Sequence, residues 1–144
     1  MAEQKPENGS MIKSFPPVSD PDARILVLGS MPGQKSLEDN QYYAHPRNLF
    51  WRFMAEVTGT PETAEYKTRI NALQKNRIAL WDVLQSCTRK GSLDTAIRDE
   101  HPNDLTGFLE KHPHITHICF NGQKAQKAFE KYIKAINAGD NITK

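Results

Sequence analysis

Apolar residues gather in three short runs along the chain, and each run predicts a buried strand. The runs cover residues 25–28, 78–81 and 115–120. Each is predominantly apolar and is bounded by turn-forming or polar residues, as in strands covered on both faces. Because such strands are typical of parallel sheets with helices on both sides, the runs favour a parallel sheet.

Segments with helical periodicity separate these runs. We expect helices over about residues 49–57, 61–74 and 104–111, with Asn103 as the N-cap of the third and His112-Pro113 as its stop. A fourth helix is predicted over residues 123–136, where apolar side chains recur on one face. This alternation of strand and helix predicts an α/β fold, a three-layer α/β/α arrangement around a short parallel sheet.

The expected domain organisation has three parts. Residues 1–20 are polar and rich in Pro and Ser, which predicts a flexible N-terminal arm. Residues 21–136 carry all the predicted strands and helices and form the domain, and residues 137–144 are a polar tail. Since three strands make a thin sheet, we expect the chain to stop before the last strand of its fold.

Composition narrows the function classes only modestly. The formal net charge of +2 permits nucleic-acid binding without arguing for it. No stretch approaches the ~18 apolar residues of a membrane span, so no membrane partner is expected. Cys87 and Cys119 stand far apart, which favours reduced thiols and an intracellular, cytoplasmic setting. We expect no metal, because the histidines at 112, 114 and 117 with Cys119 lack zinc-site spacing, and no cofactor, because phosphate-loop and dinucleotide motifs are missing.

Polar and small residues follow each predicted strand. Gly29-Ser-Met-Pro-Gly33 follows the first, Asp82 follows the second, and Asn121-Gly122 follows the third. In open parallel sheets ligands bind outside the carboxyl ends of the strands, so these residues are expected to line one rim.

Aromatic and amide side chains gather nearby, in Gln41-Tyr-Tyr-Ala-His-Pro-Arg-Asn-Leu-Phe-Trp51. Tyr42 and Tyr43 can stack on a flat heterocycle or pack in the core. Asn48 suits a pocket, yet its place before a helix fits an N-cap, which is the stronger interpretation from the residues alone. The Asn121 amide can read a base edge or shape the turn into the next helix. These alternatives stay open at this point.

Several motifs together resemble the hypoxanthine (deoxyinosine) DNA glycosylases, a branch of the uracil-DNA glycosylase superfamily. The resemblance runs from about Phe15 to Ile136. The motifs that carry it are Gly29-Ser-Met-Pro-Gly33, Tyr42-Tyr-Ala-His-Pro-Arg-Asn-Leu-Phe-Trp51, Asp82-Val-Leu-Gln-Ser-Cys87, Gly91-Ser-Leu-Asp-Thr-Ala-Ile-Arg98, Asn103-Asp-Leu105 and Phe120-Asn-Gly122.

The resemblance implies roles for individual residues. Met31 occupies the position where many members of the superfamily carry the Asn or Asp that handles water, and Asn48 takes that role instead. Tyr43 matches the ring that stacks on the flipped base, and Asn121 lies at the strand end associated with reading it, with Met31 beside them. The remaining residues of the implied site form a backbone scaffold or phosphate contact: Gly29, Ser30, Pro32, Gly33 and His45.

The expected function is therefore base excision from DNA by a monomeric enzyme of bacterial or archaeal type. The bond hydrolysed would be the N-glycosidic bond of hypoxanthine, with uracil as a second candidate base. Nothing after Ile136 resembles the second motif of the superfamily, which follows its last strand. The alternative is a truncated α/β module that binds nucleic acid or a nucleobase with weak or no catalysis.

Overall fold

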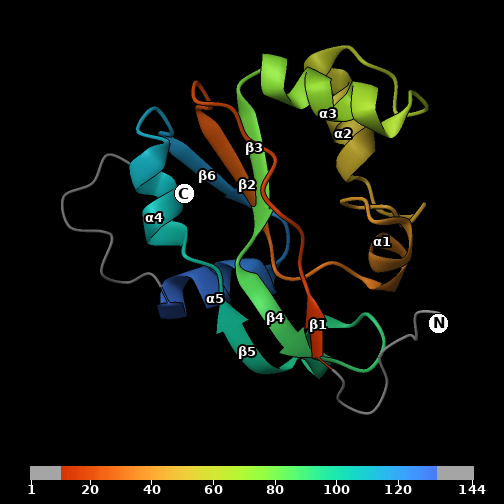
Figure 1. Ribbon diagram of the computed structural model, residues 1–144. Coiled ribbons are helices and arrows are strands. Elements are labelled where there is room, and N and C mark those ends of the chain that lie inside the picture. Colours follow the sequence, from red (N-terminus) through yellow and green to blue (C-terminus); the bar gives the residue numbers. More distant parts are fainter. Residues whose placement is uncertain (1–10, 133–144) are drawn as a thin grey trace.

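Three strands form the parallel sheet that the sequence predicts, in a computed structural model that describes residues 11–132. Strand β2 (Ile25–Gly29) lies at the centre, between β3 (Ile78–Asp82) and β6 (His117–Phe120). Figure 1 shows the strands side by side, with helices around them. The apolar runs thus become strands close to the predicted bounds. Strands β2 and β3 bury both of their faces, whereas β6, at the edge of the sheet, buries Ile118 and leaves Cys119 exposed.

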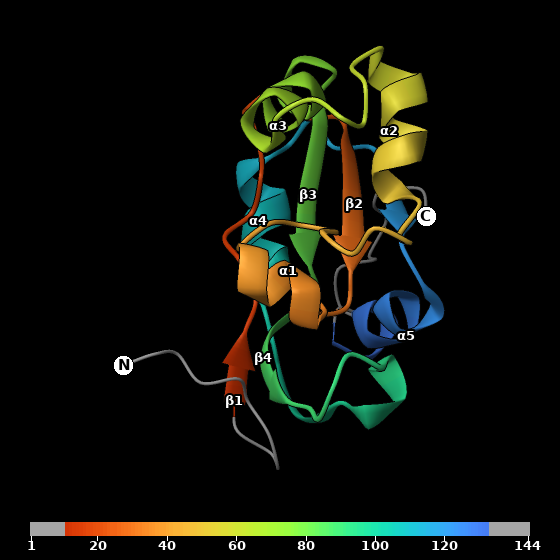
Figure 2. The ribbon, with the colours of Figure 1, turned by 90° about the vertical axis from the view of Figure 1, so that its right-hand side faces the viewer.

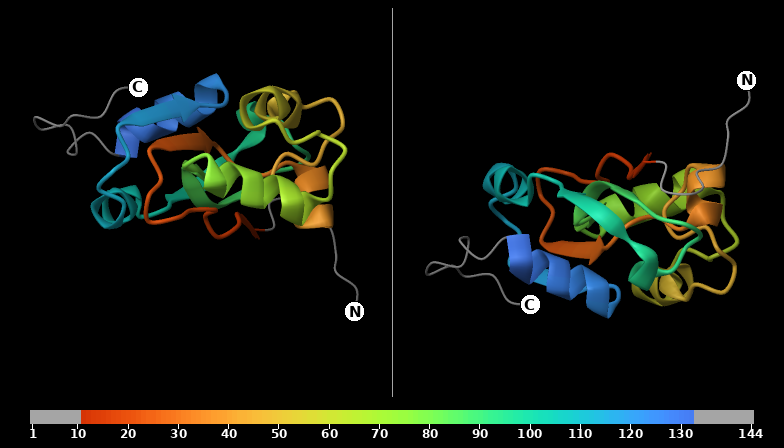
Figure 3. Two further views of the ribbon diagram at one scale, coloured as in Figure 1. Left: turned by 90° about the horizontal axis from the view of Figure 1, so that it is seen from above. Right: turned by 90° about the horizontal axis from the view of Figure 1, so that it is seen from below.

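Two apolar cores cover the two faces of this sheet. Val27 of β2 packs on one face, with α2 (Phe50–Thr58) and α3 (Tyr66–Lys75). Leu26 and Leu28 point the other way, toward α4 (Leu105–Lys111) and α5 (Gln123–Tyr132). The view from above in Figure 3 places α2 and α4 on opposite sides of the strands. The predicted three-layer arrangement is therefore present, although the last turn expected for the final helix, residues 133–136, lies outside the described residues.

A second, antiparallel sheet was not predicted. It joins β1 (Met11–Lys13), β4 (Leu84–Thr88) and β5 (Arg98–Pro102) in the order β1-β4-β5. Helix α1 (Gln34–Asp39) and a short 3-10 turn at Asp94–Ala96 are also additional. Strand β5 is mostly solvent-exposed, so its sequence carries little apolar signal of the kind that marks a buried strand.

The prediction of a flexible arm is wrong for residues 11–20, because these residues belong to the fold. Ile12 is buried and pairs with Cys87, and Val18 bridges Leu80. The carbonyl of Phe15 accepts a hydrogen bond from the Trp81 indole at 3.1 Å. The composition of residues 11–20 is polar on average, so the few apolar side chains in this segment did not stand out in the sequence. They find packing partners only in the folded chain. Residues 1–10 lie outside the described part.

The N-cap of α4 is Asp104, one residue later than expected. Its carboxylate accepts a hydrogen bond from the Gly107 N–H at 3.0 Å. Asn103 is buried instead, and its amide donates to the carbonyls of Asp82 and Leu84 at 2.8 and 3.2 Å. The sequence thus indicated the correct turn, while Asn103 itself ties the carboxyl end of β3 to the start of β4.

Candidate active site

A cavity of about 270 Å³ opens at the carboxyl ends of the parallel strands. Figure 2 shows β2 and β3 side by side, with these ends directed toward α1. All the site residues expected from the sequence line this one cavity, and they come from three separate segments. They are Gly29, Ser30, Met31, Pro32, Gly33, Tyr43, His45, Asn48 and Asn121.

The floor of the cavity depends on Gly29. Gly29 pairs with Asp82 in the parallel register of β2 and β3. A Cβ on Gly29 would come within 2.6 Å of Asp82 Oδ1 and 2.7 Å of the Tyr43 hydroxyl. The close approach of these two side chains over the strand end therefore requires glycine.

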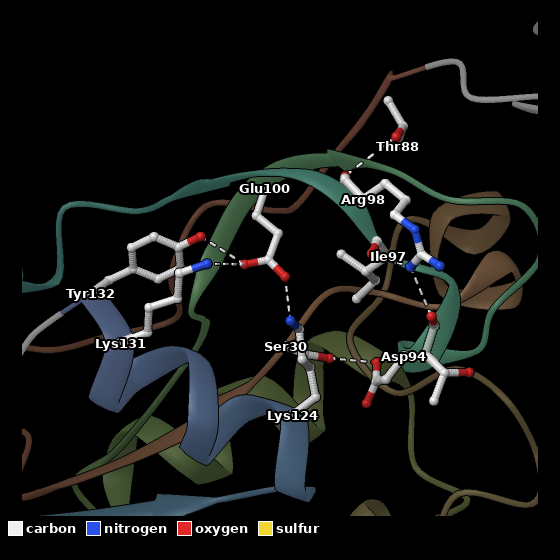
Figure 4. Close-up of polar contacts among 10 residues, drawn as sticks. Ser30, Thr88, Asp94, Ile97, Arg98, Glu100, Lys124, Lys131 and Tyr132 are labelled. Atoms are coloured by element: carbon white, nitrogen blue, oxygen red, sulfur yellow. Dashed lines mark hydrogen bonds and ion pairs between the residues drawn. The ribbon is translucent and has the colours of Figure 1, made fainter.

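Side chains from the segment between β4 and β5 hold the turn at residues 29–33. The Ser30 hydroxyl donates to Asp94 Oδ1 at 2.7 Å, as Figure 4 shows. The buried Arg89 guanidinium donates to the carbonyl of Pro32, and the Gln34 N–H donates to the Ser92 hydroxyl at 2.8 Å. The turn is consequently fixed by groups more than fifty residues away in sequence.

The two neighbouring tyrosines have different positions. Tyr42 is buried among apolar side chains, with its hydroxyl donating to the Pro16 carbonyl at 2.7 Å, so core packing is its position. Tyr43 lines the cavity and adopts a φ of 53°, which a side chain with a Cβ rarely takes. The Trp51 indole donates to the Tyr42 carbonyl and the Ala44 N–H donates to Ser36, which holds the backbone on both sides of Tyr43. Such retained strain is common in binding and catalytic sites.

Asn48 is both a turn-forming residue and a cavity residue. Its Oδ1 accepts a hydrogen bond from the Phe50 N–H at 2.9 Å, at the start of α2. The N-cap position itself belongs to Leu49. The bond fixes the amide while leaving the second lone pair of Oδ1 and both amide N–H groups for a ligand or a water. Asn48 is therefore not the N-cap that the sequence suggested, although its side chain accepts the N–H of the first helical residue and also lines the cavity.

Asn121 and Met31 complete the expected set. The Asn121 backbone N–H donates to the Leu28 carbonyl at 2.8 Å, which holds Asn121 just beyond the end of β6. Met31 is buried and belongs to the core cluster beneath the turn, although it also lines the cavity. At the rim, His45 is exposed and its Nδ1 accepts the Arg47 N–H at 3.1 Å.

Asp82 lines the cavity as the strand-end rule predicted, but the sequence interpretation assigned it no role in the site. Its side chain is only 3% exposed, and Oδ2 has no hydrogen-bond partner among the described residues. Burial first, and then the charge of Asp94, raise the pKa of this carboxyl to about 7, while Arg89 opposes the rise. Its position after an apolar strand, level with Gly29, was the signal available in the sequence.

The lysines of α5 that the structure shows in ion pairs serve a structural purpose. Lys124 on α5 forms an ion pair with Glu100 of β5, and the Tyr132 hydroxyl donates to the same carboxylate at 2.7 Å. Figure 4 shows these contacts attaching α5 to the edge of the antiparallel sheet. They attach α5, which begins just after the cavity residue Asn121, to β5.

Within residues 11–132 no three His, Cys, Asp or Glu side chains gather as metal ligands would. None of the helices described there has the length and apolar character needed to cross a membrane.

Comparison with known proteins identifies the family. The model of the Uracil DNA glycosylase superfamily matches residues 16–142. A Hypoxanthine DNA glycosylase of Methanosarcina barkeri is 38% identical over 125 residues, 86% of this chain and 78% of that protein. A second protein of that description, from Methanosarcina acetivorans, is 44% identical over 117 residues, 80% of this chain and 74% of the other.

A solved structure agrees with these relatives. The solution NMR structure of a candidate Uracil DNA glycosylase from Methanosarcina acetivorans superposes with a TM-score of 0.80 at 38% identity. The match covers 94% of this chain and 82% of that one. The α/β fold, the strand-end cavity and the resemblance of the motifs thus lead to one assignment. The chain belongs to the Uracil DNA glycosylase superfamily of DNA repair enzymes.

Proposed function

We propose that this protein removes hypoxanthine from DNA by hydrolysing the N-glycosidic bond of deoxyinosine, with uracil as a second base. The support is twofold. The relatives described as hypoxanthine DNA glycosylases share much of the sequence. The observation that carries most weight is the convergence of Tyr43, Asn48 and Asn121 on one cavity, since a ring and two amides suit a flat heterocycle with polar edges.

The substrate is a nucleotide extruded from the DNA stack. Bases inside a duplex are inaccessible, so the deaminated base must enter the cavity from an unstacked position. Tyr43 is proposed to stack on the base, because its ring faces the cavity on a backbone fixed from both sides. Asn121 is proposed to pair with the carbonyl and N–H edge that hypoxanthine and uracil have in common.

Asn48 is proposed to orient the attacking water. An amide is too weak a base to remove the proton of water, so its contribution is positional. The hydrogen bond from Phe50 N–H fixes Asn48 Oδ1, leaving a lone pair that can hold a water toward C1′ of the sugar. Backbone and side-chain groups of residues 29–33, together with His45, are proposed as the scaffold around the base or a phosphate. We further propose that the protein acts as a monomer in the cytoplasm of an archaeal-type cell, since the named relatives come from Methanosarcina.

The test is base release from a duplex that contains one deoxyinosine. Strand scission after hot alkali should appear with this duplex and with a uracil duplex, and should be missing with an undamaged duplex. Asn48→Ala should lower single-turnover release by about 100-fold or more, as expected for a positioning group. The matched control is Asn71→Ala, on the exposed face of α3, which should keep the wild-type rate.

Loss of the Phe50 contact should cost Asn48→Ala about 1 kcal/mol of stability, so thermal melting must show that the variant remains folded. A loss of only ~2-fold in rate would remove Asn48 from the role. Binding of the deoxyinosine duplex without any base release would favour the non-catalytic binding module, which the named relatives do not favour.

A further inference from the structure

Two buried oxygens without hydrogen-bond partners meet at the floor of the cavity. They are Asp82 Oδ2 and the Tyr43 hydroxyl, both enclosed and both unpaired among the described residues. Asp82 Oδ1 and the Tyr43 hydroxyl both lie within 2.7 Å of the point where a Cβ of Gly29 would stand. An unsatisfied buried carboxyl is costly to keep, so its retention at a cavity floor points to a ligand that completes it.

The groups around Asp82 favour its neutral, protonated form. Tyr42 and Tyr43 approach it from the loop after α1, and neither carries a positive charge. Asp94 approaches from the 3-10 turn with a like charge, and Arg89 supplies the opposing positive charge. Burial and Asp94 outweigh Arg89, which leaves the carboxyl able to hold a proton near neutral pH.

Besides Asp82, the polar side chains enclosed in the cavity are poor proton donors, and the titratable side chains of Lys35, His45 and Asp94 are exposed at its rim. The amides of Asn48 and Asn121 carry no ionisable proton. Burial, and next the charge of Asp82, raise the pKa of Tyr43, which makes its phenol a weaker acid than usual. The nearby Asn121 amide opposes this rise in pKa, although it does not complete a hydrogen bond of ordinary geometry with the Tyr43 hydroxyl. Asp82 is thus the enclosed acid at this site whose proton is available for transfer.

A departing purine needs such a proton. Breaking the bond between C1′ and N9 leaves the electron pair on the base, and protonation of a ring nitrogen neutralises it. We propose that Asp82 is the general acid of this enzyme, passing its carboxyl proton to a ring nitrogen of the base as the glycosidic bond breaks. This inference rests on the proposed function and adds a catalytic residue to it.

The step balances without a further reactant. The C1′–N9 bond breaks, the purine leaves as a neutral base with the Asp82 proton, and Asp82 becomes a carboxylate. Water held by Asn48 adds to C1′ and releases its proton to solvent. Asp82 recovers a proton from solvent after the base departs. The products are the abasic sugar and hypoxanthine.

The experiment measures single-turnover release of hypoxanthine from about pH 5 to about pH 9. The wild-type rate should be level at low pH and fall about tenfold per pH unit once Asp82 loses its proton. Asp82→Asn keeps the shape of the side chain but has no transferable proton, so we expect a loss of about 100-fold or more near neutral pH, with that alkaline fall gone. Asp22→Asn, an exposed aspartate near the amino end of β2, makes the same chemical change and should behave as wild type.

A binding measurement separates catalysis from the integrity of the site. Asp82→Asn should bind a duplex carrying 2′-fluoroarabino-deoxyinosine, which resists cleavage, within about threefold of wild type, because a general acid acts mainly in the transition state. A wild-type rate that is level up to about pH 9, or an Asp82→Asn rate within about threefold of wild type, would overturn the role. If the variant fails to fold, the wild-type pH profile decides alone. Wild-type protein that releases neither base at any pH would overturn the proposed function itself, and this role with it.

Discussion

Gly29 shows how one residue without a side chain can determine a site. The carboxyl of Asp82 and the phenol of Tyr43 both occupy the space in which a Cβ would stand. Neither neighbour has room to retreat, because Asp82 is buried and the Tyr43 backbone is held on both sides. Substitution here should therefore disturb both side chains at once.

Gly29→Ala should lower the stability by about 1 to 3 kcal/mol, the usual cost of forcing extra atoms into a packed region. Base release should fall with it, since Asp82 and Tyr43 are displaced together. The comparison variant for stability is Gly33→Ala, whose Cβ would meet Ser92 Oγ at an ordinary 3.5 Å. Urea unfolding of both variants checks the difference, and equal midpoints would contradict the close approach at Gly29.

Asp82 should also make stability depend on pH. Its carboxyl is raised from an ordinary pKa of 3.8 to about 7, so between these values the folded protein holds a proton that the unfolded chain has released. The contribution of Asp82 to stability therefore falls as the pH rises through this window. Asp82→Asn removes the effect, so its stability relative to wild type should increase by about 2 to 3 kcal/mol between about pH 5 and about pH 8. Urea unfolding at several pH values measures this, and a constant difference would show that the carboxyl is not held neutral.

At the scale of elements, the parallel strands were predictable and the antiparallel strands were not. Strands β2 and β3 bury both faces, which produces the continuous apolar runs seen in the sequence, and β6 buries Ile118 at the edge of the same sheet. Strand β1 has only three residues, and just the middle one is buried. Strand β5 pairs through its backbone, which leaves no trace in side-chain type. Register and pairing of this kind depend on the folded chain rather than on local sequence.

The same contrast applies to the cavity. The rule that ligands bind at the carboxyl ends of parallel strands was enough to bring residues 29–33 and Asn121 together. Asp94 and Arg89 reach the cavity region from the segment between β4 and β5, which no periodicity marked. That Asp82 Oδ2 has no hydrogen-bond partner within residues 11–132 is a property of the folded surroundings, and an aspartate in a sequence cannot show it.

Strand β1 provides a test at this scale. Ile12 is buried in the core cluster, whereas its neighbour Met11 is 51% exposed. Ile12→Ala should therefore lower the free energy of unfolding by about 2 to 3 kcal/mol, and Met11→Ala should change it by less than about 0.5 kcal/mol. Urea titration of both variants measures this. Equal, small effects would mean that β1 contributes little and that the arm is as loose as its composition suggests.

For the molecule as a whole, the reactivity of its two cysteine thiols shows whether the fold is intact. Cys119 on β6 is exposed, while Cys87 on β4 is fully buried and burial raises the pKa of its thiol. An aromatic disulfide reagent should modify Cys119 quickly and Cys87 only as the fold opens, because the thiolate is the reacting form. Cys119→Ser should eliminate the fast phase. Two fast thiols in the native protein would contradict the packing of β4 against β1.

Val83 joins the two sheets, and its position limits how the length of the chain can change. It is the single residue between β3 and β4, its N–H donates to the Gly29 carbonyl at 2.8 Å, and its own carbonyl accepts the Asn103 N–H at 2.8 Å. One residue inserted at Val83 would shift β4 by one position relative to β3. The side chains of one of these two strands would then all point to the opposite face of their sheet. Either the Asp82 side chain would point away from the cavity, or the buried side chains of β4 would point away from the core. Insertions and deletions among natural variants are therefore expected at residues 59–65, between α2 and α3, and not at this joint.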